Sequence, residues 1–384
     1  MATGVVSLSS DLVRKKWMRE GLIQAASKSF WAPYTGSSMD SIVFQVNNQN
    51  AAEGHTVVFD FDGNLSGKAI KGKNTAFGKG EQKRKFSDKI TVDRYRLVVD
   101  NGDEFDGVNI GDLSITQHSD SRSKLGDLFV RFKDQALFDA AQGFKDGGAA
   151  AASIRKVNND YSSTAAAYSD LVAIEQILRT GTGYKTGLPN ATTAAGNRAP
   201  LAPYRTADGR SMWLVVVDPY TAAKLKSNAS AGGLLQVMTD ADIRGNNGRV
   251  FKGLLGKIGQ LYFVEAESFF GYTSGTGLEG SEIEIAGLRQ YDSVNTVWTG
   301  QSAYASAVYS RNLILGAGAL QIAFGKMPDY RFQASQDFSI KSESAVEFWM
   351  ETQKTVLTAE NSDYKQAKRA DIDNGVVCWD VKVA

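Results

Sequence analysis

A long amphipathic segment, residues 119–144, is the feature that most constrains how this chain folds. Its apolar side chains recur every three or four positions along one stripe, which consists of Leu125, Leu128, Phe129, Phe132, Ala136 and Ala140 and is widened by Leu137 and Phe144. This spacing is the 3.6-residue period of a helix that buries one face. We therefore expect the long helix of the protein here, up to about 36 Å in length. Ser119 or Ser121 is the expected cap at its start, and Gly143 marks its end.

Several other segments have the composition and alternation of strands. In residues 89–99 the apolar positions alternate with a period of two, which places Ile90, Val92, Tyr95, Leu97 and Val99 on the inward face. Further strands are expected at residues 41–47, 55–61, 213–217, 282–285, 286–291, 345–353 and 376–383, and a turn and strand at residues 254–264. Strands and helices together indicate an α+β fold.

Local start and stop signals define the remaining elements. A second helix is expected over residues 169–180, with Gly181 at its C-terminal cap. Asp218 as N-cap and Pro219 at the first helical position start a short helix directly after the strand 213–217. Residues 312–324 form one buried apolar segment whose two glycines imply tight packing or a bend. An arm helix is expected from about Ser10. Residues 147–167 are a low-complexity Ala/Ser segment, and residues 181–211 are expected to be a loop or a crossing between lobes.

A glycine- and lysine-rich loop separates the strands at 55–61 and 89–99. Such a composition favours an exposed, mobile loop, so the three segments together predict an extended β-hairpin with a large tip. Its basic residues include Lys68, Lys71, Lys73, Lys79, Lys83, Arg84 and Lys85, and an acidic block with Asp100, Asp103, Glu104 and Asp106 follows directly. In a chain of net charge +1, adjacent blocks of opposite sign favour copies that dock on one another, the basic loop of one against the acids of the next. Nucleic-acid contact is the alternative for the loop, although few aromatic residues accompany its lysines.

Composition excludes several classes of protein. The chain has 384 residues, 42% of them hydrophobic and 22% charged, as in a soluble globular protein of two or three lobes. Its near-neutral charge argues against a general nucleic-acid coat. One cysteine and two histidines exclude a disulfide scaffold and a His/Cys zinc site. We expect no cofactor, signal peptide or membrane span, and synthesis in a cytoplasm-like compartment.

Two short motifs bear on an enzymatic function. Residues 57–65 resemble the first motif of haloacid-dehalogenase-type phosphotransferases, in which Asp60 would be the nucleophile and Asp62 the acid. Asn64 stands where that family has Thr or Val, and a lysine loop follows instead of a helix. Residues 67–74 come one residue short of a phosphate-binding loop, with Asn74 in place of the magnesium-binding hydroxyl. The expectation is therefore that the protein is not an enzyme, with a magnesium-dependent phosphotransferase as a remote alternative.

The ordered set of segments carries a family resemblance. A polar arm precedes the basic hairpin; then come SDSRSKLGDLFVRFKDQALFDAAQG, WLVVVDPYTAAKLK, LILGAGALQIAFGK and DNGVVCWDVKVA. This order resembles the major capsid proteins of tailed bacteriophages, specifically the branch similar to the coat protein of the N-four-like phages. The resemblance implies the HK97 fold, divided into an N-terminal arm 1–45, an extended loop with flanking strands 46–105, a peripheral domain 106–204 with the spine helix 119–144, an axial domain 205–325 and a C-terminal return 326–384.

The same resemblance implies a structural function. Copies of the chain would form hexamers and pentamers of an icosahedral shell, with a portal at one vertex and double-stranded DNA inside. Decoration or scaffolding proteins are further candidate partners. The protein would be assembled in the cytoplasm of a bacterial host and end in the virion. An encapsulin-like shell that is not viral is the alternative of the same fold.

Overall fold

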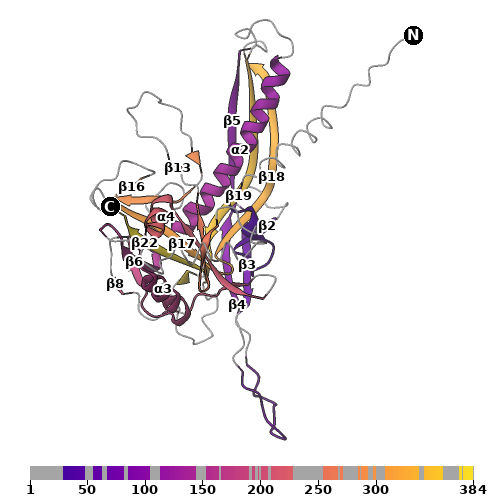
Figure 1. The fold of residues 1–384 in the computed structure, drawn as a ribbon. Coiled ribbons are helices and arrows are strands. Elements are labelled where there is room, and N and C mark those ends of the chain that lie inside the picture. Colours follow the sequence, from indigo (N-terminus) through magenta and orange to yellow (C-terminus); the bar gives the residue numbers. More distant parts are fainter. Residues whose placement is uncertain are drawn as a thin grey trace.

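The computed structural model describes residues 29–47, 55–62, 67–81, 85–103, 113–143, 153–163, 166–189, 193–194, 198, 200–205, 209–227, 254–266, 269–270, 284–285, 287–292, 297–299, 308–336, 341–357, 372–373 and 375–383. Two sheets and one long helix dominate this part of the chain (Figure 1). The expected arm helix from Ser10 lies outside the described residues.

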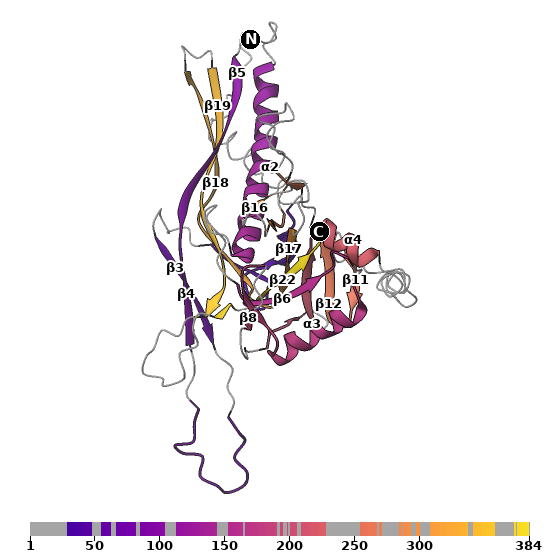
Figure 2. The same ribbon diagram turned by 90° about the vertical axis from the view of Figure 1, so that its left-hand side faces the viewer.

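An elongated five-stranded sheet forms one layer. Its strands follow the order β1 (Thr35–Gly36), β2 (Val43–Asn47), β18 (Leu320–Gln336), β19 (Lys341–Lys354) and β5 (Asp93–Asp103). β18 and β19 pair antiparallel over most of their length, and β5 pairs antiparallel with β19. Helix α2 (Leu113–Gln142) runs along this layer (Figures 1 and 2). Its 30 residues correspond to roughly 45 Å.

The predicted apolar stripe of α2 is the face that packs on the sheet. Leu125, Phe129 and Leu137 are buried in a cluster that also contains Phe348 and Met350 of β19. Phe129 and Phe348 meet edge to face, with ring centroids 4.7 Å apart. The helix begins at Leu113, so Ser119 and Ser121 lie inside it and the predicted cap is wrong. Residues 113–120 carry too few apolar side chains for the stripe to reveal this first part of the helix.

The second, larger sheet has eleven strands. Its main path is β11 (Leu254–Ile258), β12 (Leu261–Glu265), β10 (Ser211–Val217), β17 (Val308–Leu315), β22 (Val376–Lys382), β6 (Ser153–Asp160), β7 (Lys185–Gly187) and β8 (Thr193–Ala194), joined by β9 (Tyr204–Arg205), β15 (Gln290–Asp292) and β16 (Val297–Thr299). Strand β10 is buried on both faces: Leu214 packs toward α2, whereas Trp213 and Val215 pack in the cluster of α3 (Tyr168–Thr180) and α4 (Pro219–Lys226).

The start and stop signals around these helices are confirmed. Asp218 caps α4 by accepting a hydrogen bond from the backbone N of Thr221 at 2.8 Å, with Pro219 at the first position. Gly181 ends α3 with φ of 73°, a left-handed conformation that costs glycine little.

Three segments differ from the sequence expectation. Residues 181–211, expected as a loop or lobe crossing, contain the short strands β7, β8 and β9. Residues 312–324 are two strands of different sheets, β17 and β18, and the chain crosses between the sheets at the turn 316–319. At Gly316 a Cβ would collide with the backbone oxygen of Ala202, which explains the glycine there. The low-complexity segment 147–167 contains strand β6, whose charged residues concealed its β pattern.

The predicted β-hairpin is present. β3 (Thr56–Asp62) pairs antiparallel with β4 (Lys85–Thr91), from Thr56 opposite Thr91 to Asp62 opposite Lys85. Val57, Phe59, Ile90 and Val92 form a small core with Ala323 of β18. The expected strand 89–99 is divided at Val92, so Ile90 and Val92 face this core while Leu97 packs on the cluster of α2.

The remaining elements are short. They are the 3-10 helix η1 (Ala32–Tyr34), the pair β13 (Phe269–Phe270) and β14 (Glu284–Ile285), and the pair β20 (Val356–Leu357) and β21 (Ile372–Asp373). Among the described residues, no helix combines the length and hydropathy needed to cross a membrane.

Candidate functional site: the projecting hairpin and a buried charged junction

The tip of the hairpin projects beyond the ends of β3 and β4, away from both sheets (Figures 1 and 2). All residues from 67 to 80 are exposed. The backbone N of Lys79 donates to the oxygen of Ala76 at 3.2 Å, and Gly78 within this turn has φ of 77°. The side chain of Asn74 donates to the oxygen of Lys71 at 2.9 Å and closes a second turn, in which Gly72 has φ of 72°. Local hydrogen bonds thus shape the tip.

The structure places the predicted basic residues in two groups. Lys68, Lys71, Lys73 and Lys79 are exposed on the projecting tip. Lys85 begins β4, but its side chain lies outside the described part, as do the whole residues Lys83 and Arg84. The four described lysines therefore form one exposed basic surface on the hairpin tip.

The predicted acidic residues lie on a different part of the chain. Asp100 is exposed on β5, opposite Glu343 of β19. Asp103 ends β5 with its side chain outside the described part, and Glu104 and Asp106 lie outside the described residues. β5 runs from the base of the hairpin toward the far end of the elongated sheet (Figure 2). Within one chain, the described structure does not bring the tip lysines to Asp100.

The phosphotransferase motif does not have the structural context that its chemistry needs. Asp60 and Asp62 are both residues of β3, opposite Ser87 and Lys85 of β4. The strand continues into the projecting loop, whereas the motif requires a helix to follow. The arrangement is a hairpin strand approaching its turn.

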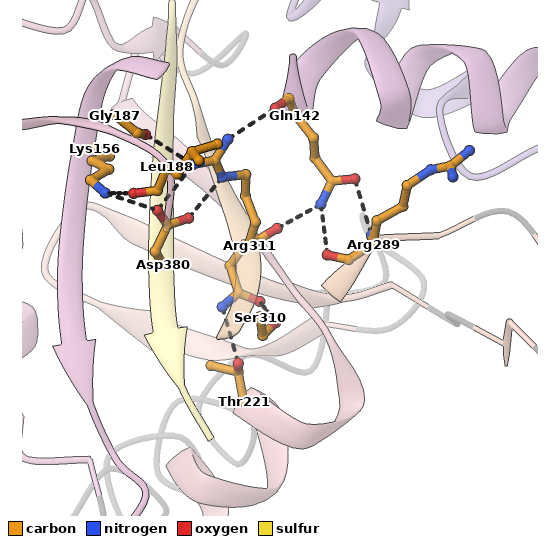
Figure 3. Close-up of polar contacts among 10 residues, drawn as sticks. Gln142, Lys156, Gly187, Leu188, Thr221, Arg289, Ser310, Arg311 and Asp380 are labelled. Carbon is orange, nitrogen blue, oxygen red and sulfur yellow. Dashed lines mark hydrogen bonds and ion pairs between the residues drawn. The ribbon is translucent and has the colours of Figure 1, made fainter. Parts of the chain in front are cut away.

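A buried charged cluster joins α2 to the eleven-stranded sheet (Figure 3). Arg311 of β17 donates two hydrogen bonds to the carboxylate of Asp380 of β22, at 2.9 and 3.1 Å. The Nζ of Lys156 of β6 lies 3.7 Å from the same carboxylate and donates to the backbone oxygen of Leu188. All three charged side chains are 0% exposed. Burial lowers the pKa of Lys156, although the Asp380 carboxylate acts in the opposite direction.

Gln142, the last residue of α2, connects the helix to this cluster. Its backbone oxygen accepts from Arg311 Nη1 at 3.2 Å, so a guanidinium satisfies a carbonyl at the helix end. Its side-chain amide donates to the backbone oxygens of Arg311 and Arg289, at 2.9 and 3.2 Å, and accepts from the backbone N of Arg289 at 3.0 Å. Arg289 also makes two hydrogen bonds to Asp139 of α2, at 2.7 and 2.9 Å. The C-terminal end of α2 is therefore fixed to the sheet by directed polar contacts.

Asp134, in the middle of α2, holds the first described residues of the chain. Its carboxylate accepts from Ser29 Oγ at 2.7 Å and from the backbone N of Phe30 at 2.6 Å. Its backbone oxygen accepts from the indole of Trp31 at 3.3 Å, and the Trp31 ring packs against Phe138 at 4.8 Å between centroids. Burial raises the pKa of Asp134. The N-terminal segment is thus anchored to the long helix.

The sequence interpretation did not identify the members of these buried clusters. For Asp380 a signal exists, because it is a charged residue between apolar neighbours in strand β22, whereas Arg311 gives a weaker signal because polar Ser310 and Asn312 flank it. A charge in such a place needs a buried partner. The partner itself cannot be read from the sequence, since 69 positions separate the two residues.

Comparisons with known proteins agree on one family. The family model described as phage capsid protein matches residues 5–356. Among solved structures, the capsid of Ralstonia phage GP4 is similar with a TM-score of 0.65 and 18% identity, over 100% of this chain and 99% of that one. The acid-stable capsid of Helicobacter pylori bacteriophage KHP30 has a TM-score of 0.65 and 14% identity over 92% and 91%. The cyanophage Pam1 capsid has a TM-score of 0.56 and 12% identity over the full length of both chains. No curated protein matches the chain significantly.

Proposed function

Because this chain belongs to the phage capsid protein family, we propose a specific way in which its copies build a shell. It is a structural protein of the virion and not an enzyme, which confirms the function and location expected from the sequence. The predicted α+β fold of HK97-type capsids is likewise confirmed over the whole chain. The family assignment decides against the phosphotransferase and the non-viral shell.

Copies of the chain assemble into hexamers and pentamers of an icosahedral shell around double-stranded DNA, with a portal at one vertex. The resemblance to the N-four-like branch and the use of a scaffolding or decoration protein belong to the same proposal. Self-association is the part that membership in the family supports directly.

The two sheets divide the subunit into the peripheral and axial domains. The five-stranded sheet with α2 corresponds to the peripheral domain, and the eleven-stranded sheet with α3 and α4 to the axial domain. In this division β6 and α3 go with the axial domain, because β6 pairs with β22 and α3 packs in the same core as β10. Hairpin β3–β4 with its tip is the extended loop.

The projecting tip is the observation that carries the assembly proposal. Four lysines, Lys68, Lys71, Lys73 and Lys79, are exposed on a loop that reaches away from its own chain. Such a loop supports contact with a neighbouring copy, whose acceptors are drawn from Asp100, Asp103, Glu104 and Asp106. Because donor and acceptor surfaces are different parts of one chain, the same contact can repeat from copy to copy in a heterologous arrangement, and heterologous contacts close into rings when the rotation permits.

Charge reversal on the loop tests this contact. Replacing Lys83, Arg84 and Lys85 with Glu should abolish or misdirect assembly. The loop and the acidic surface of the neighbouring copy would then both be negatively charged and would repel each other. A matched control replaces Lys83 and Lys85 with Arg, which keeps the charge. Negative-stain microscopy and velocity sedimentation count the particles. Particles of normal shape and yield from the Glu variant would exclude an electrostatic contact through Lys83, Arg84 and Lys85.

A further inference from the structure

The hairpin tip carries one large aromatic side chain that its own fold leaves in solvent. Phe77 is 94% exposed, the highest value among the exposed large apolar residues of the described chain. It stands in the turn closed by Lys79 and Ala76, next to Gly78 with its positive φ, so the backbone presents its ring outward. A Cβ added at Gly78 or Gly80 would meet no atom within 4 Å, which shows how open the surroundings are.

Folding of the free subunit buries almost none of this ring, so the ring contributes little to the stability of the subunit alone. Burying a Phe side chain is favourable relative to leaving it in water, so this gain is left for an intermolecular contact. Aromatic residues are enriched among the few side chains that supply most of the affinity of an interface. Phe77 is an aromatic side chain that the tip turn exposes beside several lysines, so it has the properties of an interface anchor.

A pocket of suitable size lies elsewhere on the same chain. It has a volume of about 270 Å³ and lies where the C-terminal end of α2, strand β4 and the end of β19 meet. Its lining includes Ala140, Thr352 and Val356, with Asp88, Glu351 and Lys89 among the charged groups. A cavity of about 150 Å³ holds one benzene molecule, while small-molecule sites start near 300 Å³. The pocket thus has room for a single aromatic side chain.

The charges around the pocket fit the lysines beside Phe77 only in part. Asp88 accepts from the backbone N of Val356 at 3.1 Å and from that of Lys89 at 2.9 Å, which fixes its carboxylate at the pocket. Asp88 and Glu351 are acceptors within reach of lysines that arrive with the ring. Lys89 and Lys354 also line the pocket, so it is not acidic overall. The volume of the pocket, rather than its charge, is what matches the Phe77 ring.

We propose that Phe77 of one copy inserts into this pocket of a second copy and anchors the hairpin tip there. The inference rests on the proposed function, which supplies the second copy. Since Phe77 and the pocket are separate surfaces of one chain, each subunit is both donor and receiver. Repeated insertion around a ring leaves neither surface unpaired within a capsomer.

Site-specific photo-crosslinking tests the contact. Phe77 is replaced by p-azidophenylalanine, which keeps the ring, and assembled particles are illuminated and digested. The expected product is a covalent dimer or higher ring on a denaturing gel, whose joined peptide falls within residues 85–91, 140–143 or 351–356. The matched control carries the same group at Val172 of α3, which is 44% exposed and should not label these peptides. Particles that crosslink only at other peptides, or only within one chain, would overturn the inference while leaving the capsid function intact.

Substitution gives an independent readout. Phe77→Ser should raise the subunit concentration needed for assembly by about tenfold or more, as removal of an interface anchor does. Phe77→Tyr should stay close to wild type, because it keeps the ring. Because residue 77 packs on nothing in its own chain, neither change should shift the melting temperature of the unassembled subunit. An unchanged concentration threshold for Phe77→Ser would contradict the proposal. Absence of particles from the wild-type chain would instead contradict the proposed function.

Discussion

Removing the carboxylate of Asp380 is the sharpest test of how the subunit is held together. This side chain accepts two hydrogen bonds from Arg311 and lies 3.7 Å from the Nζ of Lys156, and all three side chains are fully buried. In Asp380→Asn the two cations lose their only counter-charge in the cluster drawn in Figure 3. Hydrogen bonds to charged groups contribute about 1.5–3 kcal/mol each. Breaking a buried ion pair by removing one partner costs about 3–5 kcal/mol.

We expect the free energy of unfolding to fall by about 3 kcal/mol, at the lower end of that range. Burial already lowers the pKa of Lys156, so this side chain can lose its proton in the variant and relieve part of the repulsion. A lysine whose folded pKa lies below its unfolded value gains stability as pH rises toward the unfolded value. The variant should therefore recover part of its stability as pH rises toward the ordinary lysine value of about 10.4.

Urea unfolding of the unassembled subunit, followed by tryptophan fluorescence, measures the effect. Lys156→Met added to Asp380→Asn should restore part of the loss, since it removes one unpaired cation. The surface pair Lys226–Glu265, with side chains 45% and 29% exposed, is the matched control. Glu265→Gln should change stability by no more than about 1 kcal/mol. If Asp380→Asn also stays within about 1 kcal/mol of wild type, the cluster does not stabilise the fold as argued.

The remaining predictions concern the N-terminal anchor and the turn between the sheets. Burial raises the folded pKa of Asp134. Its contribution to stability is therefore fully present below the ordinary aspartate value of about 3.9 and declines as pH rises through the raised value. The difference in unfolding free energy between wild type and Asp134→Asn, measured against pH, should show this decline, and a flat difference would refute it. Gly375→Ala should cost about 1–3 kcal/mol, because its φ is 77° and the new Cβ would lie 2.7 Å from the backbone oxygen of Ala317. Thermal unfolding should show this loss but none for Gly80→Ala, where a Cβ meets nothing, and equal melting temperatures for the two variants would count against the argument.

Periodic patterns and capping residues predicted the helices and strands that depend on residues close together in the sequence. The stripe at Leu125, Phe129 and Leu137 found the buried face of α2, and Asp218 with Pro219 found the start of α4. Both depend on residues within a few turns of one another, which is the information that a single sequence carries.

Elements stabilised by distant residues were missed. Strand β6 carries buried Arg155 and Lys156, and Lys156 is tolerated inside because Asp380, far along the chain, lies beside it. The first turns of α2 and the division of residues 312–324 between two sheets likewise follow from tertiary packing. For the hairpin tip, the exposure of Lys68, Lys71, Lys73 and Lys79 agrees with the expected exposed loop, whereas the role of the basic residues and their acceptors on a neighbouring copy remain a prediction.

The central claim is that this chain has the surfaces to assemble with copies of itself into a shell. Negative-stain electron microscopy of the purified wild-type protein, brought to assembly conditions, tests it most directly. We predict closed, roughly spherical particles or rings of five and six subunits, the products of a repeated heterologous contact. The account would be contradicted by a protein that stays monomeric at every concentration and salt condition although its cooperative thermal unfolding shows that it is folded.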